Sequence, residues 1–249
     1  MALQETFEKQ GNFLFRYRSF LPLLILAAGI GVFIVDLNQG ALSDDQAYRN
    51  LQLFSLLVSF LGLAIRIIAV GHSPANTSGR NTKEQLADEV NTTGIYSTVR
   101  HPLYLGNFFM WLGAVILIGN HWFTLAFALA YWIYYERIMF AEEQFLRAKF
   151  GQIYLDWANR TPAFIPALSK STKSVYPFSV KKVLKKEKNG VLAIFALLFI
   201  FHNLRLIVQF EEWKLSVDWV FWTTVVSGVL YLVLKVVKKY TSLLDEKGR

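Results

Sequence analysis

The segment from Gly94 to Gly106 holds the densest set of side chains able to bind a charged ligand, and it reads Gly-Ile-Tyr-Ser-Thr-Val-Arg-His-Pro-Leu-Tyr-Leu-Gly. Arg100 and His101 stand directly before Pro102, a residue that suits the first turn of a helix because its missing N–H bond costs nothing there. We therefore expect the two basic side chains to lie beside a helix N-terminus. Gly106, one turn further on, would permit the close approach of a ligand or of another helix.

A second group with possible chemistry is the acidic pair Glu142-Glu143, which begins a segment of charged and apolar residues. The positions that recur there at helical spacing are Phe145, Leu146, Lys149, Phe150, Ile153 and Tyr154. This pattern predicts an amphipathic helix, which Pro162 and Pro166 would end.

The two groups are joined by a pair of apolar stretches, residues 103–119 and 121–140. The connection Gly119-Asn120-His121 is so short that the two stretches must form an antiparallel helical hairpin. The hairpin returns the acidic pair to the side of Arg100 and His101. We therefore predict that the basic, aromatic start of one helix and the acidic end of the next meet at a pocket.

Apolar stretches of similar length recur along the chain, which has 249 residues and is 54% hydrophobic. A helix needs roughly 20 mostly apolar residues to cross a hydrocarbon core of about 30 Å. We predict an all-α, polytopic transmembrane helix bundle with about six spans, near residues 20–37, 51–70, 103–119, 121–140, 190–210 and 216–237. Residues 1–19 are expected to form a short helix at the membrane interface.

The Lys and Arg residues concentrate in alternate loops, which predicts that both termini and the Arg100–His101 segment lie in the cytoplasm. This arrangement explains the net charge of +8 without a nucleic-acid partner. The chain has no cysteine, and its 4 histidines show no ligand-like spacing, so we expect no disulfide and no bound metal.

Four parts of the chain follow from these features. Residues 1–50 would hold the interfacial segment and the first span, and residues 51–166 would form the core with the cofactor-binding segments. Residues 167–189 are predicted to be a basic cytoplasmic linker, and residues 190–249 a C-terminal transmembrane hairpin with its tail.

The pattern G-x-Y-x-x-x-R-H-P-x-Y-x-G, followed by a hairpin, a Glu-Glu helix and a closing R-x-P, resembles the isoprenylcysteine carboxyl methyltransferase and phospholipid methyltransferase superfamily. The resemblance covers about residues 60–166. Members bind S-adenosylmethionine in a pocket that faces the cytoplasm and take lipid acceptors from the bilayer. A bacterial branch with a similar loop, Thr77 to Asn81, acts on phosphorylated lipids such as lipid A. The resemblance thus implies an inner-membrane O-methyltransferase acting on a phosphate or carboxylate of a lipid or lipidated acceptor.

The residues that the resemblance implies for binding S-adenosylmethionine are Tyr96, Arg100, His101, Pro102, Tyr104, Leu105, Glu142, Glu143, Tyr154 and Arg160. Arg100, Glu143 and Arg80 are predicted to be catalytic, with Arg80 positioning an anionic headgroup. Aromatic rings stabilise a sulfonium cation by about 0.5–2 kcal/mol per contact. A carboxylate or phosphate acceptor is already ionised, so the chain mainly has to align the reacting groups.

Two other functions fit part of the pattern. Nicotinamide-dependent membrane reductases of the sterol or steroid type have a similar R-H-P-x-Y helix start, but they generally have more spans. A non-enzymatic membrane scaffold would have no pocket beside the hairpin. Arg66, inside a predicted span, is either a side chain that reaches the interface or a functional ion. The identity of the acceptor and the oligomeric state stay open.

Overall fold

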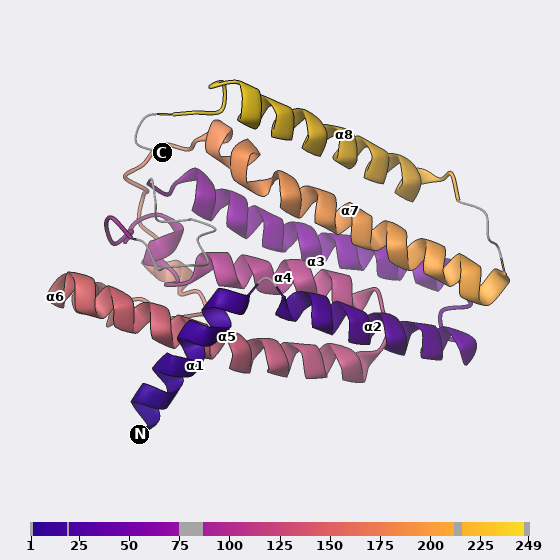
Figure 1. The fold of residues 1–249 in the computed structure, drawn as a ribbon, viewed down its shortest axis with the longest axis horizontal. Coiled ribbons are helices and arrows are strands. Elements are labelled where there is room, and N and C mark those ends of the chain that lie inside the picture. The colour runs from indigo at the N-terminus through magenta and orange to yellow at the C-terminus, as the bar shows by residue number, and fades with distance from the viewer. Residues whose placement is uncertain (1, 19, 75–86, 212–215, 247–249) are drawn as a thin grey trace.

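The computed structural model describes residues 2–18, 20–74, 87–211 and 216–246, and these residues form helices and loops without a strand (Figure 1). The α-helices are α1 (Leu3–Tyr17), α2 (Leu21–Asn38), α3 (Asp45–Gly71), α4 (Pro102–Ile116), α5 (His121–Phe150), α6 (Gln152–Ala158), α7 (Val180–Phe210) and α8 (Trp219–Tyr240). The prediction of an all-α bundle is confirmed. Each predicted span falls on a helix, and α4 and α5 form the predicted hairpin.

Polar side chains fix where four of these helices begin, because each accepts a backbone N–H of the first turn: Asp44, Asn120, Ser179 and Asp218. The amphipathic segment after α5 is not one continuous helix. Gly151, with φ of 55°, adopts a left-handed conformation that separates α5 from α6.

The predicted linker is shorter than residues 167–189. Ser179 caps α7, and residues 180–189 form its first turns. Hydropathy alone misses these turns because they are rich in lysine, although lysine is a good helix former.

The prediction of about six spans is not confirmed. By length and composition three helices can cross a membrane, namely α3, α7 and α8, and α1 with α2 adds a fourth if this pair, bent by 73°, counts as one span. The apolar helix α4 has only 15 residues, which is about 22 Å at 1.5 Å per residue. Helix α5 is long enough, but it mixes Tyr, Glu and Arg residues with its apolar ones.

Helices α3 and α4 approach each other closely because glycines face the contact. A Cβ atom on Gly62 would collide with the backbone of Gly106, and one on Gly113 would collide with Ser59. The hydroxyl of Ser55 donates to the carbonyl of Gly113 at 2.6 Å. Small residues at such contacts allow backbones to pack within membranes. The contact fixes the register of the two helices that carry much of the site.

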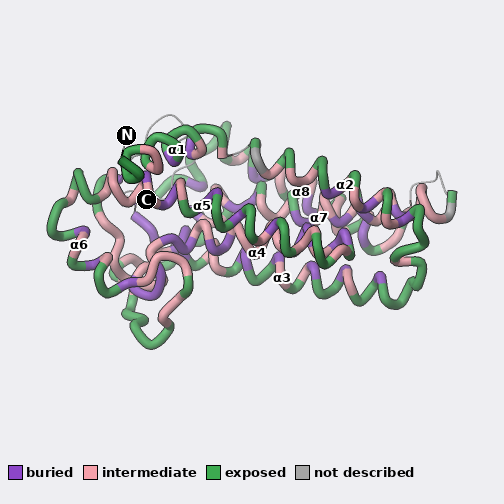
Figure 2. The backbone as a smooth tube through the Cα atoms, turned by 90° about the horizontal axis from the view of Figure 1, so that it is seen from below, coloured by how far each residue is buried: buried purple, intermediate pink, exposed green. Residues whose placement is uncertain are grey.

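The outward faces of the bundle are exposed, whereas buried residues lie between the helices (Figure 2). Large apolar side chains on these outer faces include Leu57, Trp122, Ile133, Val226 and Leu232. So much exposed apolar surface would be unfavourable in water, and it is what a lipid-facing surface requires. Helix α1 and the residues after α8 lie at the same end of the bundle (Figure 1).

Candidate functional site

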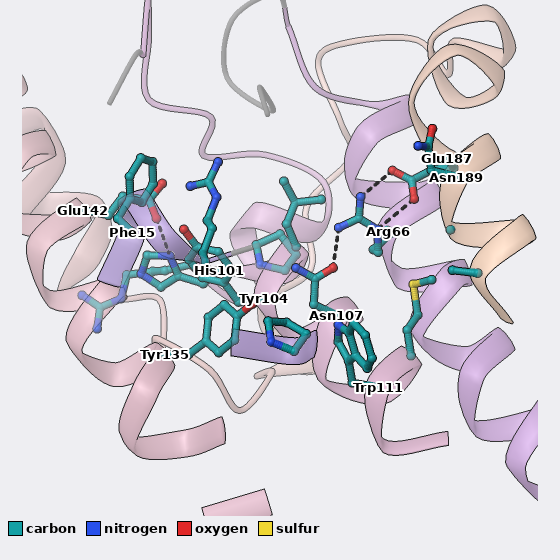
Figure 3. Close-up of a pocket in the computed structure, with 18 of the residues that line it drawn as sticks. Phe15, Arg66, His101, Tyr104, Asn107, Trp111, Tyr135, Glu142, Glu187 and Asn189 are labelled. Carbon is teal, nitrogen blue, oxygen red and sulfur yellow. Dashed lines mark hydrogen bonds and ion pairs between the residues drawn. The ribbon is translucent and has the colours of Figure 1, made fainter. Parts of the chain in front are cut away.

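A cavity of about 730 Å³ is lined at one end by residues of α1, α6 and the start of α7, and it continues between α3, α4 and α7. Figure 3 shows side chains from several helices converging on it. Its size is in the range of sites for cofactors and other small molecules.

The polar end of the cavity is built by two segments that run side by side just before α4 and just after α6. The backbone N–H of Arg100 donates to the carbonyl of Pro162 at 2.8 Å, and that of His101 donates to the carbonyl of Ala163 at 3.2 Å. Pro102 then opens α4. The start of α4 is thereby held against the loop that follows α6.

The acidic residues at the end of α5 reach the basic residues at the start of α4. His101 Nε2 lies 2.9 Å from Glu143 Oε1, and Arg100 Nη1 lies 3.2 Å from Glu143 Oε2. His101 Nδ1 lies 3.8 Å from Glu142 Oε2. Burial raises the pKa of Glu143, but the hydrogen bond and charge of His101 and the charge of Arg100 outweigh burial and leave this pKa below 4.5. The Glu143 carboxylate is thus the anion that contacts both basic side chains at this end of the cavity.

Aromatic rings cover the same end. The ring of Tyr104 is stacked on His101 at 5.7 Å between centroids and contacts Tyr135 at 5.0 Å. Burial, reinforced by the charge of Glu142, raises the pKa of the Tyr96 hydroxyl above its ordinary value, so this group stays protonated. These rings give a ligand cation electron-rich faces beside a carboxylate.

Most of the side chains predicted for the site line the cavity: Tyr96, Arg100, His101, Pro102, Tyr104, Glu142 and Tyr154. Glu143 does not line it but holds Arg100 and His101 from behind. Leu105 is buried in the helix packing. Arg160 is exposed, and its carbonyl accepts a hydrogen bond from Lys170. Arg80 lies outside the described residues.

The structure adds residues to the cavity wall that the sequence did not suggest: Phe15, Arg18, Asn107, Trp111, Glu187 and Asn189. Glu187 interrupts a run of lysines just before an apolar stretch, and this isolated acid was a signal that could have been used. Asn107 and Trp111 follow Tyr104 at helical spacing on α4, a second signal that could have been used. Phe15, Arg18 and Asn189 carry no such pattern, because their proximity depends on how α1 and α7 pack.

Arg66 is not simply reaching for the membrane surface. Its Nε and Nη2 donate to the two carboxylate oxygens of Glu187 at 2.8 and 2.7 Å, and its Nη1 donates to Asn107 Oδ1 at 2.6 Å. Arg66, Glu187 and Asn107 belong to α3, α7 and α4, and all three line the cavity (Figure 3).

The polar end has unused hydrogen-bonding capacity that fits an amino-acid group. Among the described residues, the buried Oε2 of Glu142 and the buried Nε of Arg100 have no hydrogen-bond partner. A carboxylate oxygen can accept from an ammonium, and a guanidinium N–H can donate to a carboxylate. S-adenosylmethionine carries both groups on its amino-acid tail, together with a sulfonium cation. The residues present therefore fit this cofactor.

Comparison with known proteins agrees with this chemistry. Residues 51–153 match the phospholipid methyltransferase family. The protein-S-isoprenylcysteine O-methyltransferase of Schizosaccharomyces pombe is 41% identical over 31% of this chain and 33% of its own length. The protein of the same name from Tribolium castaneum is 32% identical over 45% of this chain and 40% of its own length.

A nickel-cobalt-cadmium resistance protein of Alcaligenes xylosoxydans xylosoxydans is 31% identical over 56% of this chain and 62% of its own length. The chain thus spans between a third and about three fifths of the length of these curated relatives. No solved structure matches it.

The matched region contains most of α3, all of α4 and α5, and the Arg100, His101, Glu142 and Glu143 cluster. Helices α7 and α8 lie beyond it. Residues 51–153 are thus similar to the phospholipid methyltransferase family, and part of the chain is similar to protein-S-isoprenylcysteine O-methyltransferases.

Proposed function

We propose that this chain is an integral membrane enzyme that transfers a methyl group from S-adenosylmethionine to an anionic oxygen of a lipid or lipidated acceptor. The observation that carries the proposal is the meeting of Arg100, His101 and Glu142 at the polar end of the cavity, with two buried polar atoms that have no hydrogen-bond partner among the described residues. The family match covers this cluster.

In this proposal the Glu142 carboxylate binds the ammonium of the cofactor tail, and Arg100 binds the tail carboxylate. Glu143 keeps Arg100 and His101 in place through its two short contacts. Tyr96 and Tyr104 lie close enough to the cluster to offer their ring faces to the sulfonium. When bound, S-adenosylmethionine supplies a methyl group whose carbon–sulfur electron pair stays on sulfur as an acceptor oxyanion forms the new carbon–oxygen bond. No general base is required.

The charges around the cavity favour an anionic acceptor. The described charged side chains that line it, histidine aside, are three arginines and three glutamates: Arg18, Arg66, Arg100, Glu89, Glu142 and Glu187. The cofactor brings one net positive charge, from a sulfonium, an ammonium and a carboxylate. A singly charged oxyanion would balance it, whereas a protonated amine would add a second uncompensated charge in a partly dry site.

The acceptor is proposed to come from the membrane. The cavity continues from its polar end into an apolar part between α3, α4 and α7, and the outer faces of the bundle are apolar. Helix α1 and the residues 241–246 after α8 lie at the site's end of the bundle (Figure 1). The proposal places this end at the cytoplasmic face of a bacterial inner membrane. A phosphorylated lipid related to lipid A and a prenylated cysteine both meet these requirements.

Ligand binding separates this proposal from the reductase alternative. The purified protein in detergent should bind radiolabelled S-adenosylmethionine and its demethylated product in equilibrium dialysis, and an excess of NADPH should not displace them. Glu142→Ala should weaken binding by about tenfold or more, because one charge-assisted hydrogen bond is lost. Displacement by NADPH, or unchanged affinity in the variant, would contradict the proposal. A scaffold without a site would bind neither ligand.

A further inference from the structure

Arg66 is an arginine within an apolar helix whose guanidinium group keeps hydrogen-bonding capacity toward the cavity. A guanidinium has five N–H bonds. Three of them are used, two on Glu187 and one on Asn107. One N–H on each terminal nitrogen therefore remains for a ligand. The side chain is 15% exposed, and Arg66 lines the cavity.

Glu187 holds this arginine in a defined orientation. Its carboxylate is 3% exposed and occupies the edge of the guanidinium formed by Nε and Nη2, which leaves the opposite end of the group to face elsewhere. Asn107 fixes Nη1 from α4. Such a planar fork, pinned on one side, suits binding of a carboxylate or phosphate better than a lysine ammonium would.

The position of Arg66 in the cavity is informative. Figure 3 shows Arg66 between the His101 and Glu142 end of the cavity and the Glu187 and Asn189 side chains of α7. The cavity also has an apolar part. The apolar lining includes Met110, Ala114, Ile194, Leu197 and Leu198. A ligand with an anionic head and a hydrocarbon chain could therefore place its head at Arg66, facing the cofactor end, and its chain among these side chains.

We propose that Arg66 binds the oxyanion of the methyl acceptor, and that Glu187 and Asn107 are positioning residues that orient its guanidinium. This inference rests on the proposed function and names the acceptor subsite within the same cavity. It also assigns a role to α7, which lies beyond the region matched to the family. The shared chemistry is an oxyanion next to an apolar chain, whether the carboxylate of a prenylated cysteine or the phosphate of a lipid.

Two ligand pairs that differ in one anionic group test the proposal without any cofactor. The first is N-acetyl-S-farnesyl-L-cysteine and its methyl ester, and the second is dioleoylphosphatidate and dioleoylglycerol in detergent micelles. Binding to the purified full-length chain is measured by the rise in unfolding temperature as ligand is titrated. We expect the anionic member of at least one pair to bind about tenfold more tightly than its neutral partner, and the preferred pair identifies the source of the oxyanion.

Arg66→Met should abolish this preference, and Arg66→Lys should retain only part of it because an ammonium keeps the charge but lacks the fork. Arg205→Met is the matched control, since Arg205 is a buried arginine that pairs with a carboxylate at the other end of the same two helices and does not line the cavity. It should keep the full preference. If Arg66→Met fails to fold with Glu187 left unpaired, the double variant Arg66→Met with Glu187→Gln removes both charges and allows the same measurement.

An equal affinity of the parent for both members of both pairs would overturn the inference, as would a preference that survives in Arg66→Met or in the double variant. Failure of the proposed function looks different. In that case the parent would still prefer the anionic ligand, but it would neither bind S-adenosylmethionine nor transfer its methyl group.

Discussion

Two ion pairs join α3 to α7, one near each end of their contact. The helix that supplies the cation in one pair supplies the anion in the other. At the site end, α3 supplies Arg66 and α7 supplies Glu187. At the far end, α3 supplies Asp45 and α7 supplies Arg205, 2.8 Å apart. Both pairs hold the same helices together, so the ways in which they differ show what the site end does beyond holding the fold.

At the far end, Arg205 directs its hydrogen bonds to other groups of the protein. Arg205 Nε donates to the carbonyl of Leu42 at 2.8 Å, Nη2 donates to Ser43 and Asp45, and the guanidinium lies over the ring of Tyr48. Its partner Asp45 is 72% exposed. Arg205 thus closes the loop between α2 and α3 against α7. At the site end both side chains of the pair are shielded from solvent, yet Arg66 keeps N–H donors that face the cavity. Holding α3 against α7 does not require such donors.

The largest expected difference between the two ends is in stability. Glu187→Ala leaves Arg66 buried without its counter-ion, which should cost about 3–5 kcal/mol of unfolding free energy. Asp45→Ala removes a partner that is exposed to solvent, and Arg205 keeps its hydrogen bonds to the carbonyls of Leu42 and Ser43, so this variant should cost about 1 kcal/mol or less. Denaturation by sodium dodecyl sulfate in mixed micelles measures both. Equal losses would show that the two pairs do not differ in the way their burial suggests.

The two ends of the bundle should also differ in how their histidines affect the affinity for S-adenosylmethionine. His101 lies at the site end between Glu142 and Glu143, and His202 lies at the far end, 2.7 Å from Asp218. His101→Ala should weaken binding of S-adenosylmethionine by about 10-fold to 100-fold, the worth of a lost charge-assisted contact. His202→Ala should leave the affinity unchanged. Isothermal titration calorimetry measures the affinity of both variants for S-adenosylmethionine. A similar loss of affinity in both would contradict the assignment of the site.

Packing between α3 and α4 should matter somewhat less. Gly113→Ala places a methyl group against Ser59 and should destabilise the protein by about 1–3 kcal/mol. Gly228→Ala in α8 meets no atom within 4 Å and is the matched control. It should be neutral or slightly stabilising, because alanine is the better helix former. Thermal unfolding in detergent measures both, and a neutral Gly113→Ala would mean that α3 and α4 do not pack this closely.

The smallest effect concerns pH. The pKa of Glu143 is lowered in the folded chain, so its contacts stabilise the fold above the ordinary carboxyl pKa of about 4.3 and are lost as pH falls through the lowered value. Between pH 7 and pH 3 the parent should lose more stability than Glu143→Gln, whose amide does not titrate. Unfolding temperatures across this range test the point. Parallel curves would show that the Glu143 contacts add no stability.

The hairpin and the meeting of His101 with the Glu pair could be predicted because they depend on local sequence. The tight turn at Gly119-Asn120-His121 allows only one arrangement of α4 and α5, and Pro102 marks where α4 begins. The family resemblance then indicated which residues at the open end of the hairpin, away from its turn, to consider.

The Arg66–Glu187 pair could not be predicted in this way, because its members stand 121 positions apart and meet only through the packing of α3 on α7. Hydropathy further obscured Glu187, since the lysine-rich first turns of α7 read as a linker. Spacing also cannot tell which side of the chain faces a cavity. Arg160 fits the motif, yet it lies exposed beyond α6.

The most direct test of the account is transfer of a labelled methyl group from S-adenosylmethionine into lipids and lipidated proteins of membranes that contain the chain. We expect the label as a methyl ester on oxygen, labile to mild alkali if the acceptor is a carboxylate and resistant if it is a phosphate, formed by the parent and by Arg205→Met but not by His101→Ala or Arg66→Met. No label with the parent, or label on a lipid amine that persists in Arg66→Met, would contradict it.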